Sequence, residues 1–190
     1  MPKGQAITGE HLTAGDVLIG LPSAGVHSNG YSLVRKIVNH VGLAYTDEAP
    51  FEAEHPGRDL MRWTEGKATL GEVFLTPTRI YCDPVVDLLN AARGGEDFGI
   101  EDVHGICHIT GGGLSNLLRL HPSLGWDIHT PLPVLPEFKW LQSAGGVETR
   151  EMYRTFNMGM GMVIAVDAAR SDAVLRLSLI HISEPTRLAW

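Results

Sequence analysis

Apolar and polar residues fall into alternating blocks along the chain, and the sharpest boundaries lie near its start. Residues 16–21 contain the short apolar core of a buried strand, between Gly15 and Pro22. A loop of small and polar residues follows as far as Gly30. A helix is predicted next, because apolar side chains recur at helical spacing: Leu33, Val34, Ile37, Val38 and Val41. This order places the loop at the carboxyl end of a strand, where open α/β sheets usually bind ligands.

The rest of the chain continues the alternation. Further strands are predicted at residues 103–109, 126–129 and 158–166. A helix is predicted from Asp83 (as N-cap) to Gly95, and another at residues 148–156. The helix predicted at residues 114–120 has Leu114, Leu117 and Leu118 facing inward, and a short helix around Phe138 and Leu141 is predicted to end at Gly145 and Gly146. Residues 45–65 are acidic and aperiodic, which predicts a surface excursion. Strands that alternate with helices predict a layered α/β domain.

Composition narrows the class of protein. Of the 190 residues 44% are apolar, which is enough for a packed core in one domain or a little more. The formal charge is −7, so we expect no nucleic-acid partner, and the scattered cations suit a small phosphorylated ligand better than a polymer. Two cysteines favour a reducing cytoplasm over a disulfide framework. Without a leader at Met1 or an apolar run of roughly 20 residues, we expect a cytoplasmic protein with no membrane partner.

The two ends of the chain differ from its middle. Residues 1–15 have no apolar core of their own and are interpreted as the end of a preceding domain and its linker. Residues 177–187, LSLIHISEPTR, look like the translation of a sequencing adapter, so we predict that residues 177–190 are a foreign tail. The alternative is a genuine C-terminal strand and loop. On the adapter interpretation the native domain covers residues 16–176 and is incomplete.

The first candidate site is the loop that carries His27, Ser28 and Asn29. A histidine titrates near physiological pH and moves protons, while serine and asparagine make directional hydrogen bonds. The alternative is structural: Ser28 or Asn29 caps the helix and His27 is a surface residue.

A second candidate is the run Thr110, Gly111, Gly112 and Gly113, between a predicted strand and a predicted helix. Backbone N–H groups of consecutive glycines approach an anion closely, and a helix N-terminus adds partial positive charge. A tight turn is the ordinary alternative.

Two arginines are further candidates for binding a phosphate. Arg154 and Asn157 lie three residues apart, so they would share a helix face, with Arg154 contacting a phosphate bidentately. Arg79, just before a predicted helix, is a similar candidate. A solvated arginine is the alternative in both cases.

Metal and thiol chemistry is disfavoured. His104 and His108 would lie on one strand face but about 13 Å apart, which is too far to chelate one ion. Cys107 and His108 are neighbours in the predicted strand, so their side chains would point to opposite faces, and Cys107 is expected to be a buried free thiol. No metal site is predicted.

Several separated motifs occur in one order: ITG with GDVLIGLP, HSNGYSLVRK, LTPTRIY, VHGICHITGGG and EMYRTFNMGMGM. Together they resemble the C-terminal domain of the phosphoribosylformylglycinamidine cyclo-ligases, the aminoimidazole ribonucleotide synthetases of purine synthesis. That family implies an α/β (α+β) domain with α/β/α layers and a mixed sheet. It also implies a two-domain homodimeric enzyme whose absent N-terminal domain binds most of the ATP and Mg²⁺.

The resemblance also implies a reaction and site roles. ATP phosphorylates the formyl oxygen of formylglycinamidine ribonucleotide, a nearby nitrogen attacks, and phosphate leaves as the imidazole ring closes. His27 and Asn29 would be catalytic, and the other candidates would bind substrate or phosphate: Ser28, Arg79, Thr110, Gly111, Gly112, Gly113, Arg154 and Asn157. The fragment alone is expected to be inactive. The alternatives are a non-catalytic phosphate-binding module, or a domain of the related selenophosphate synthetase or thiamine-monophosphate kinase type.

Overall fold

A four-stranded sheet forms the centre of the computed structural model, which describes residues 6–53, 67–181 and 186–188. The strands are β1 (Val17–Pro22), β2 (Val103–His108), β3 (Met160–Val166) and β4 (Thr186–Leu188), in the spatial order β2-β3-β1-β4. Every pair of neighbours is antiparallel, with Ile19 opposite Ile164 in the central pair. β1 and β3 are apolar on both faces, as expected for strands that are covered on both sides.

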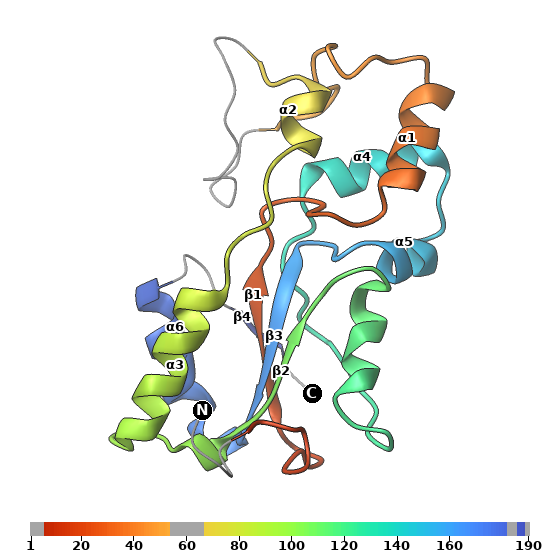
Figure 1. Ribbon diagram of the computed structural model, residues 1–190. Helices are drawn as coiled ribbons and strands as arrows, with labels where there is room; N and C mark the ends of the chain where they lie inside the picture. The colour runs from red at the N-terminus through yellow and green to blue at the C-terminus, as the bar shows by residue number, and fades with distance from the viewer. Residues whose placement is uncertain (1–5, 54–66, 182–185, 189–190) are drawn as a thin grey trace.

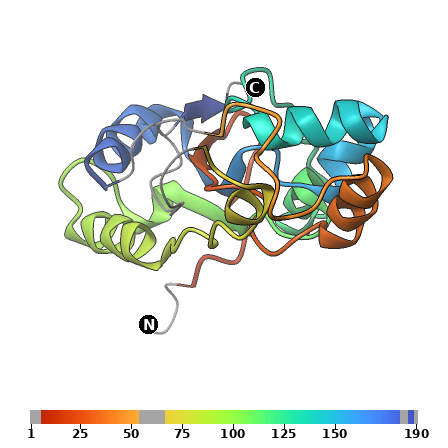
Figure 2. The ribbon, with the colours of Figure 1, turned by 90° about the horizontal axis from the view of Figure 1, so that it is seen from above.

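The helical segments surround the sheet and extend beyond one of its ends. They are α1 (Tyr31–His40), α2 (Leu70–Phe74), α3 (Cys82–Gly94), η1 (Ile100–Asp102), η2 (Gly113–Arg119), α4 (Pro136–Gly145), α5 (Thr149–Thr155), η3 (Ala168–Arg170) and α6 (Ser171–His181), where η marks a 3₁₀ helix. α3 and α6 lie together on one side of the molecule, and α1, α4 and α5 on the other (Figure 2).

Three apolar clusters hold these layers together. Alternate residues of β1 divide between the sheet faces: Ile19 packs with α3 and α6, and Leu18 packs with Leu117 of η2 on the opposite face. The third cluster lies beyond the end of the sheet, where α1, α2, α4 and α5 form a lobe around Phe138 and Phe156 (Figure 1). This arrangement confirms the α/β class and the helical layers on both sides of the sheet.

The expectation of a mixed sheet is wrong for the strand pairs that the structure describes. Parallel neighbours need a crossover connection, usually a helix packed across the sheet. Here α1 and α2, which follow β1, leave the sheet and enter the lobe instead of crossing it (Figure 1). The pattern of strand and helix along the chain does not distinguish these two paths.

Most predicted elements are present, and their ends follow local chemistry. The strands at residues 16–21, 103–109 and 158–166 are confirmed as β1, β2 and β3. Helices α3 and α4 end where predicted, because Gly95 (φ 68°) and Gly146 (φ 58°) adopt the left-handed conformation at their C-caps.

Asp83 does not cap α3. The helix begins one residue earlier, at Cys82, with Tyr81 at the N-cap position and without a capping side chain. Asp83 lies in the first turn, where its charge still interacts favourably with the helix dipole.

Leu117 and Leu118 differ in burial because the segment that carries them is a 3₁₀ helix and not an α-helix. Leu114, Leu117 and Leu118 were all predicted to face inward, but Leu118 is 61% exposed while Leu117 is buried. Since η2 is a 3₁₀ helix with three residues per turn, Leu114 and Leu117 share a face and Leu118 does not. Val41 is exposed for a simpler reason, because α1 ends at His40.

The strand predicted at residues 126–129 is wrong, since that segment is irregular. Trp126 and Ile128 alternate with polar residues because they contact the outer side of the Leu18 cluster, without strand pairing. Of the predicted surface excursion at residues 45–65, the structure describes residues 45–53, and this part packs inward. Ala49 and Ala53 are buried against the lobe, and Glu48 forms an isolated antiparallel β-bridge with Thr69.

The C-terminal segment is helical as far as His181, and Thr186–Leu188 pairs with β1 at the sheet edge. Neither observation tests the origin of residues 177–190, so the foreign tail stays a prediction. None of the helices that the structure describes combines the length and apolar character needed to cross a bilayer.

Candidate functional site

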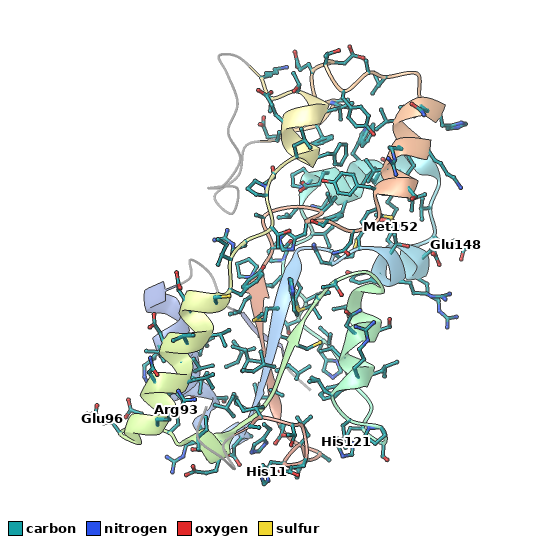
Figure 3. All side chains as sticks on the ribbon, in the orientation of Figure 1. His11, Arg93, Glu96, His121, Glu148 and Met152 are labelled. Carbon is teal, nitrogen blue, oxygen red and sulfur yellow. The ribbon has the colours of Figure 1, made fainter. Side chains whose placement is uncertain are left out.

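Four segments meet where β1 and β2 end and β3 begins, between the sheet and the lobe. They are the loop at residues 23–30, the coil at residues 76–81, residues 108–116 and residues 157–161. In Figure 3 the lobe end of the molecule is marked by Met152 and Glu148, and the opposite end by His11 and His121. The expectation that polar side chains gather at the carboxyl end of the first strand is confirmed.

His27 is the most constrained residue of this site. It is only 3% exposed, and its φ of 55° lies in the left-handed region that residues with a Cβ rarely adopt. Its Nε2 accepts a hydrogen bond from the backbone N–H of Ala24 at 3.1 Å. Since a backbone N–H is always a donor, Nε2 is unprotonated, and the neutral ring carries its hydrogen on Nδ1.

That Nδ1 is buried and makes no hydrogen bond to any residue that the structure describes. An unsatisfied buried donor costs about 1–3 kcal/mol, so a second partner from outside these residues would stabilise it. Burial lowers the pKa of His27 from 6.5 to about 4, helped by the proximity of His108 and Arg79. A surface position for His27 is therefore wrong. The expectation that its free imidazole titrates near pH 7 is also wrong, because the ring is desolvated.

Two aromatic side chains complete the surroundings of His27, and neither was among the predicted site residues. The ring centroids of Tyr81 and His108 lie 6.2 Å and 6.4 Å from that of His27, and 5.6 Å from each other. Tyr81 is buried, whereas His108 is exposed. The signal that would have found His108 is its place as the last residue of a strand, directly before the glycine run.

The Asn29 loop and the glycine run lie side by side. Asn29 Oδ1 is 3.4 Å from the position that a Cβ on Gly111 would take. Ser28, the residue before Asn29, is exposed beside them. The structure thus brings together two motifs that lie about 80 residues apart in the sequence.

The glycine run is a turn held by Asn116. The Asn116 Oδ1 accepts from the backbone N–H and hydroxyl of Thr110, and its Nδ2 donates to Gly111 O. Gly113 donates its N–H to Thr110 O. A side chain at this position would overlap the carbonyl oxygen of Tyr153, which leaves no room for a Cβ. Gly113 is therefore a packing glycine, and its N–H is not directed at an anion.

Gly111 and Gly112 differ from Gly113, since their N–H groups donate to no residue in the described part of the chain. Both lie on the accessible side of the turn. The feature that remains for anion binding is this pair of amides, because the short 3₁₀ segment that follows adds little dipole.

The predicted pairing of Arg154 with Asn157 is not found. Helix α5 ends at Thr155, so the two residues do not share a helix face, and Arg154 is exposed near Glu151. Asn157 is fully buried and fastens the His27 loop: its Oδ1 accepts from Ser23 Oγ and Gly159 N–H, and its Nδ2 donates to Gly25 O, each at 2.9 Å. Asn157 is therefore a structural residue of the site.

Arg79 is a cation whose charge acts on the loop at residues 23–30. Its side chain is half-buried in the coil between α2 and α3, and its charge acts to lower the pKa of both His27 and Tyr81. A cation here would attract an anion toward the two histidines.

No cluster of three or more metal-binding side chains occurs among the described residues. His104 contacts Asp16 at the opposite end of the sheet, with 2.7 Å between Nδ1 and Oδ2, while His108 faces His27. Cys107 is a buried free thiol, as predicted, and burial raises its pKa.

Comparison with known proteins identifies the family of the chain. Residues 13–179 match the family described as AIR synthase related protein, C-terminal domain. Relatives named phosphoribosylformylglycinamidine cyclo-ligase occur in Methanosarcina barkeri (42% identity; 90% of this chain and 45% of the relative) and Methanosarcina mazei (43%; 86% and 42%). A chloroplastic enzyme of that name from Arabidopsis thaliana is 42% identical, over 91% of this chain and 39% of the relative.

The chain thus spans less than half the length of these relatives. Its match covers the strand-end loops, the glycine run and the three principal strands. The chain belongs to the AIR synthase related protein family, of which it carries the C-terminal domain.

Proposed function

We propose that this chain is the C-terminal half of a phosphoribosylformylglycinamidine cyclo-ligase, which closes the imidazole ring of aminoimidazole ribonucleotide with the use of ATP. The observation that carries the proposal is the meeting of the His27–Asn29 loop with the glycine run, at 3.4 Å between Asn29 Oδ1 and the Cβ position of Gly111. The names of the relatives suggest the reaction, and this juxtaposition supports our assignment of the substrate to this end of the sheet.

Each side chain has a role that its geometry permits. His27, neutral at pH 7, offers Nδ1–H to a substrate oxygen, while Nε2 is held by Ala24. Asn29 orients the substrate beside the glycine run, with Ser28 and Thr110 as further hydrogen-bonding groups. The amides of Gly111 and Gly112, with Arg79, bind a phosphate of the ligand. Arg154 contacts the ligand only from the exposed rim.

We further propose, from the family resemblance, that ATP with Mg²⁺ binds mainly to the N-terminal half found in the longer relatives. The complete protein would be a homodimer that works in the cytoplasm on a small phosphorylated substrate. In this arrangement residues 6–15 lead from that half into β1.

A matched pair of glycine variants tests the phosphate subsite. Gly111→Ala adds a methyl group at van der Waals distance from Asn29, on the face that a ligand would approach, whereas Gly125→Ala adds one in open space. We expect titration of the 190-residue chain with inorganic phosphate, followed by NMR, to show affinity about tenfold weaker for Gly111→Ala and unchanged for Gly125→Ala.

To test the proposed enzymatic activity, the chain must be joined to the N-terminal half of a relative. Ring-closing turnover of this two-domain protein, reduced in Gly111→Ala and retained in Gly125→Ala, would support the proposal. Equal phosphate affinity and equal turnover in the two variants would contradict it. Phosphate binding without any turnover in the joined protein would instead favour a non-catalytic binding module.

A further inference from the structure

We propose that Tyr81 is a positioning residue of this site, which holds the His27 loop so that Nδ1–H of His27 is the donor presented to the ligand, and whose ring packs beside both His27 and His108. The proposal rests on the proposed function, because Tyr81 acts only through these two side chains.

The hydroxyl of Tyr81, at the N-cap of α3, makes a hydrogen bond at the start of the loop at residues 23–30. It donates a hydrogen bond to Pro22 O at 2.8 Å. Pro22 is the last residue of β1, at the point where the register with β3 shifts. Desolvation raises the pKa of Tyr81, so the hydroxyl stays protonated and remains a donor. Five residues after Pro22 the chain reaches the left-handed turn at His27.

The ring of Tyr81 lies against both histidines. Its plane is tilted by 59° to each of them. The centroid of His108 lies 5.6 Å from that of Tyr81 and 6.4 Å from that of His27. Loss of this ring would leave a hole that the two imidazoles are free to enter, because packed side chains shift into adjacent space.

A glycine in β3 provides the space that Tyr81 occupies. A Cβ on Gly161 would lie 1.8 Å from Tyr81 Oη and 3.0 Å from His27 Cε1. Glycine weakens a strand interior, so its presence here is explained by the close approach of these two side chains. The carbonyl of Gly161 also accepts from Ile109 N–H at 2.8 Å, which fixes the residue that follows His108.

These contacts bear on the tautomer of His27. In a free neutral imidazole the two ring nitrogens compete for one hydrogen, and the hydrogen bond of one decides the state of the other. Here Ala24 N–H selects the Nδ1–H form, but only while the left-handed turn keeps Nε2 near that N–H. The loop is held by two hydrogen bonds, from Asn157 Nδ2 to Gly25 O and from the Tyr81 hydroxyl to Pro22 O at its beginning.

NMR of ¹⁵N-labelled histidine in the 190-residue chain tests this inference without any need for activity. We expect the wild-type His27 to show a protonated Nδ1 and an unprotonated Nε2, with the signal assigned by its loss in His27→Gln. In Tyr81→Phe, which keeps the ring, the two nitrogen shifts should move toward the averaged values of a free imidazole. Tyr45→Phe, which alters a surface tyrosine, should leave them unchanged.

The larger change Tyr81→Leu should also alter the shifts of His108, and if it does not fold, Tyr81→Phe still decides the question. In the two-domain enzyme, Tyr81→Phe should lower turnover about tenfold with KM changed less than about twofold. An unaltered Nδ1–H signal in Tyr81→Phe would overturn the positioning role. By contrast, normal turnover in His27→Gln would remove the proposed function and leave the NMR result intact.

Discussion

Two buried histidines lie at opposite ends of the sheet, and they differ in how their nitrogens are satisfied. His104, 8% exposed, lies at the start of β2 with its Nδ1 2.7 Å from Asp16 Oδ2. Asp16 also accepts from the N–H and hydroxyl of Thr13, so this polar group is well bonded. His27 lies beyond the end of β1 with one nitrogen bonded to Ala24 and the other without a partner among the described residues.

On the proposed function, this difference separates a structural histidine from a functional one. A buried carboxylate–imidazole pair whose hydrogen bonds are made within the protein fixes the fold and gains nothing from a ligand. An orphaned buried donor is costly in the free protein, and a ligand group that accepts its hydrogen bond would offset that cost. Both histidines are buried, so burial alone does not distinguish His27, to which we assign a function, from His104.

The largest expected effect comes from removing His27 in the joined two-domain enzyme. His27→Gln keeps hydrogen-bonding capacity through its new amide but loses the imidazole, and general acid–base groups contribute about 10²–10⁴-fold. We expect turnover to fall by at least about 10²-fold while thermal stability barely changes. The matched control is His40→Gln, at an exposed position on the last turn of α1, which should keep full turnover. Near-normal turnover in a folded His27→Gln protein would leave His27 as a loop residue.

The reverse effect is expected at the other end of the sheet. His104→Leu leaves the buried carboxylate of Asp16 without its imidazole partner, which should lower the free energy of unfolding by about 2 kcal/mol in urea denaturation. Turnover per folded molecule should stay within about twofold of wild type. A large loss of turnover in stably folded His104→Leu would show that the two ends are coupled, and the comparison would fail.

A smaller effect concerns pH. The folded pKa of His27 is about 4 and the ordinary value is 6.5, so the unfolded chain binds more protons between these values. The stabilisation from the neutral, buried ring is therefore complete above about pH 6.5 and is lost as the pH falls toward 4. Between pH 7 and pH 5.5 we expect this to cost about 1 kcal/mol of unfolding free energy.

Urea denaturation at several pH values, on wild type and His27→Gln, isolates this contribution. The variant lacks the titrating ring, so its stability should fall less over the same range. Identical pH dependence of the two proteins would show that His27 is readily protonated in the folded chain.

The smallest effect is expected away from both histidines, at the sheet edge, and gives a baseline for the other measurements. If residues 177–190 are a foreign tail, their deletion should change the free energy of unfolding by less than about 0.5 kcal/mol, within the range of surface changes. A loss of several kcal/mol would show that the pairing of Thr186–Leu188 with β1 is a native part of the sheet.

The sequence by itself determined the local elements and the loops that matter. Short apolar runs placed β1, β2 and β3, since strands covered on both sides are apolar throughout, and helical spacing of apolar residues placed α1. Glycines at Gly95 and Gly146 marked helix ends, since they adopt the left-handed conformation without steric cost. The loop with His27 and the glycine run were recognised as candidates from their place between strand and helix.

Only the tertiary structure decided how those parts combine. Antiparallel pairing and the lobe depend on where each helix packs, and the local pattern is the same for either topology. Asn157 was predicted to bind a phosphate, but it is fully buried. Its amide instead makes hydrogen bonds to Ser23 Oγ, Gly25 O and Gly159 N–H, which hold the His27 loop in place. Tyr81 and His108 join His27 from segments more than 50 residues away in the sequence. The neutral state of His27 follows from its desolvation and from the Ala24 hydrogen bond, and both exist only once the chain has folded.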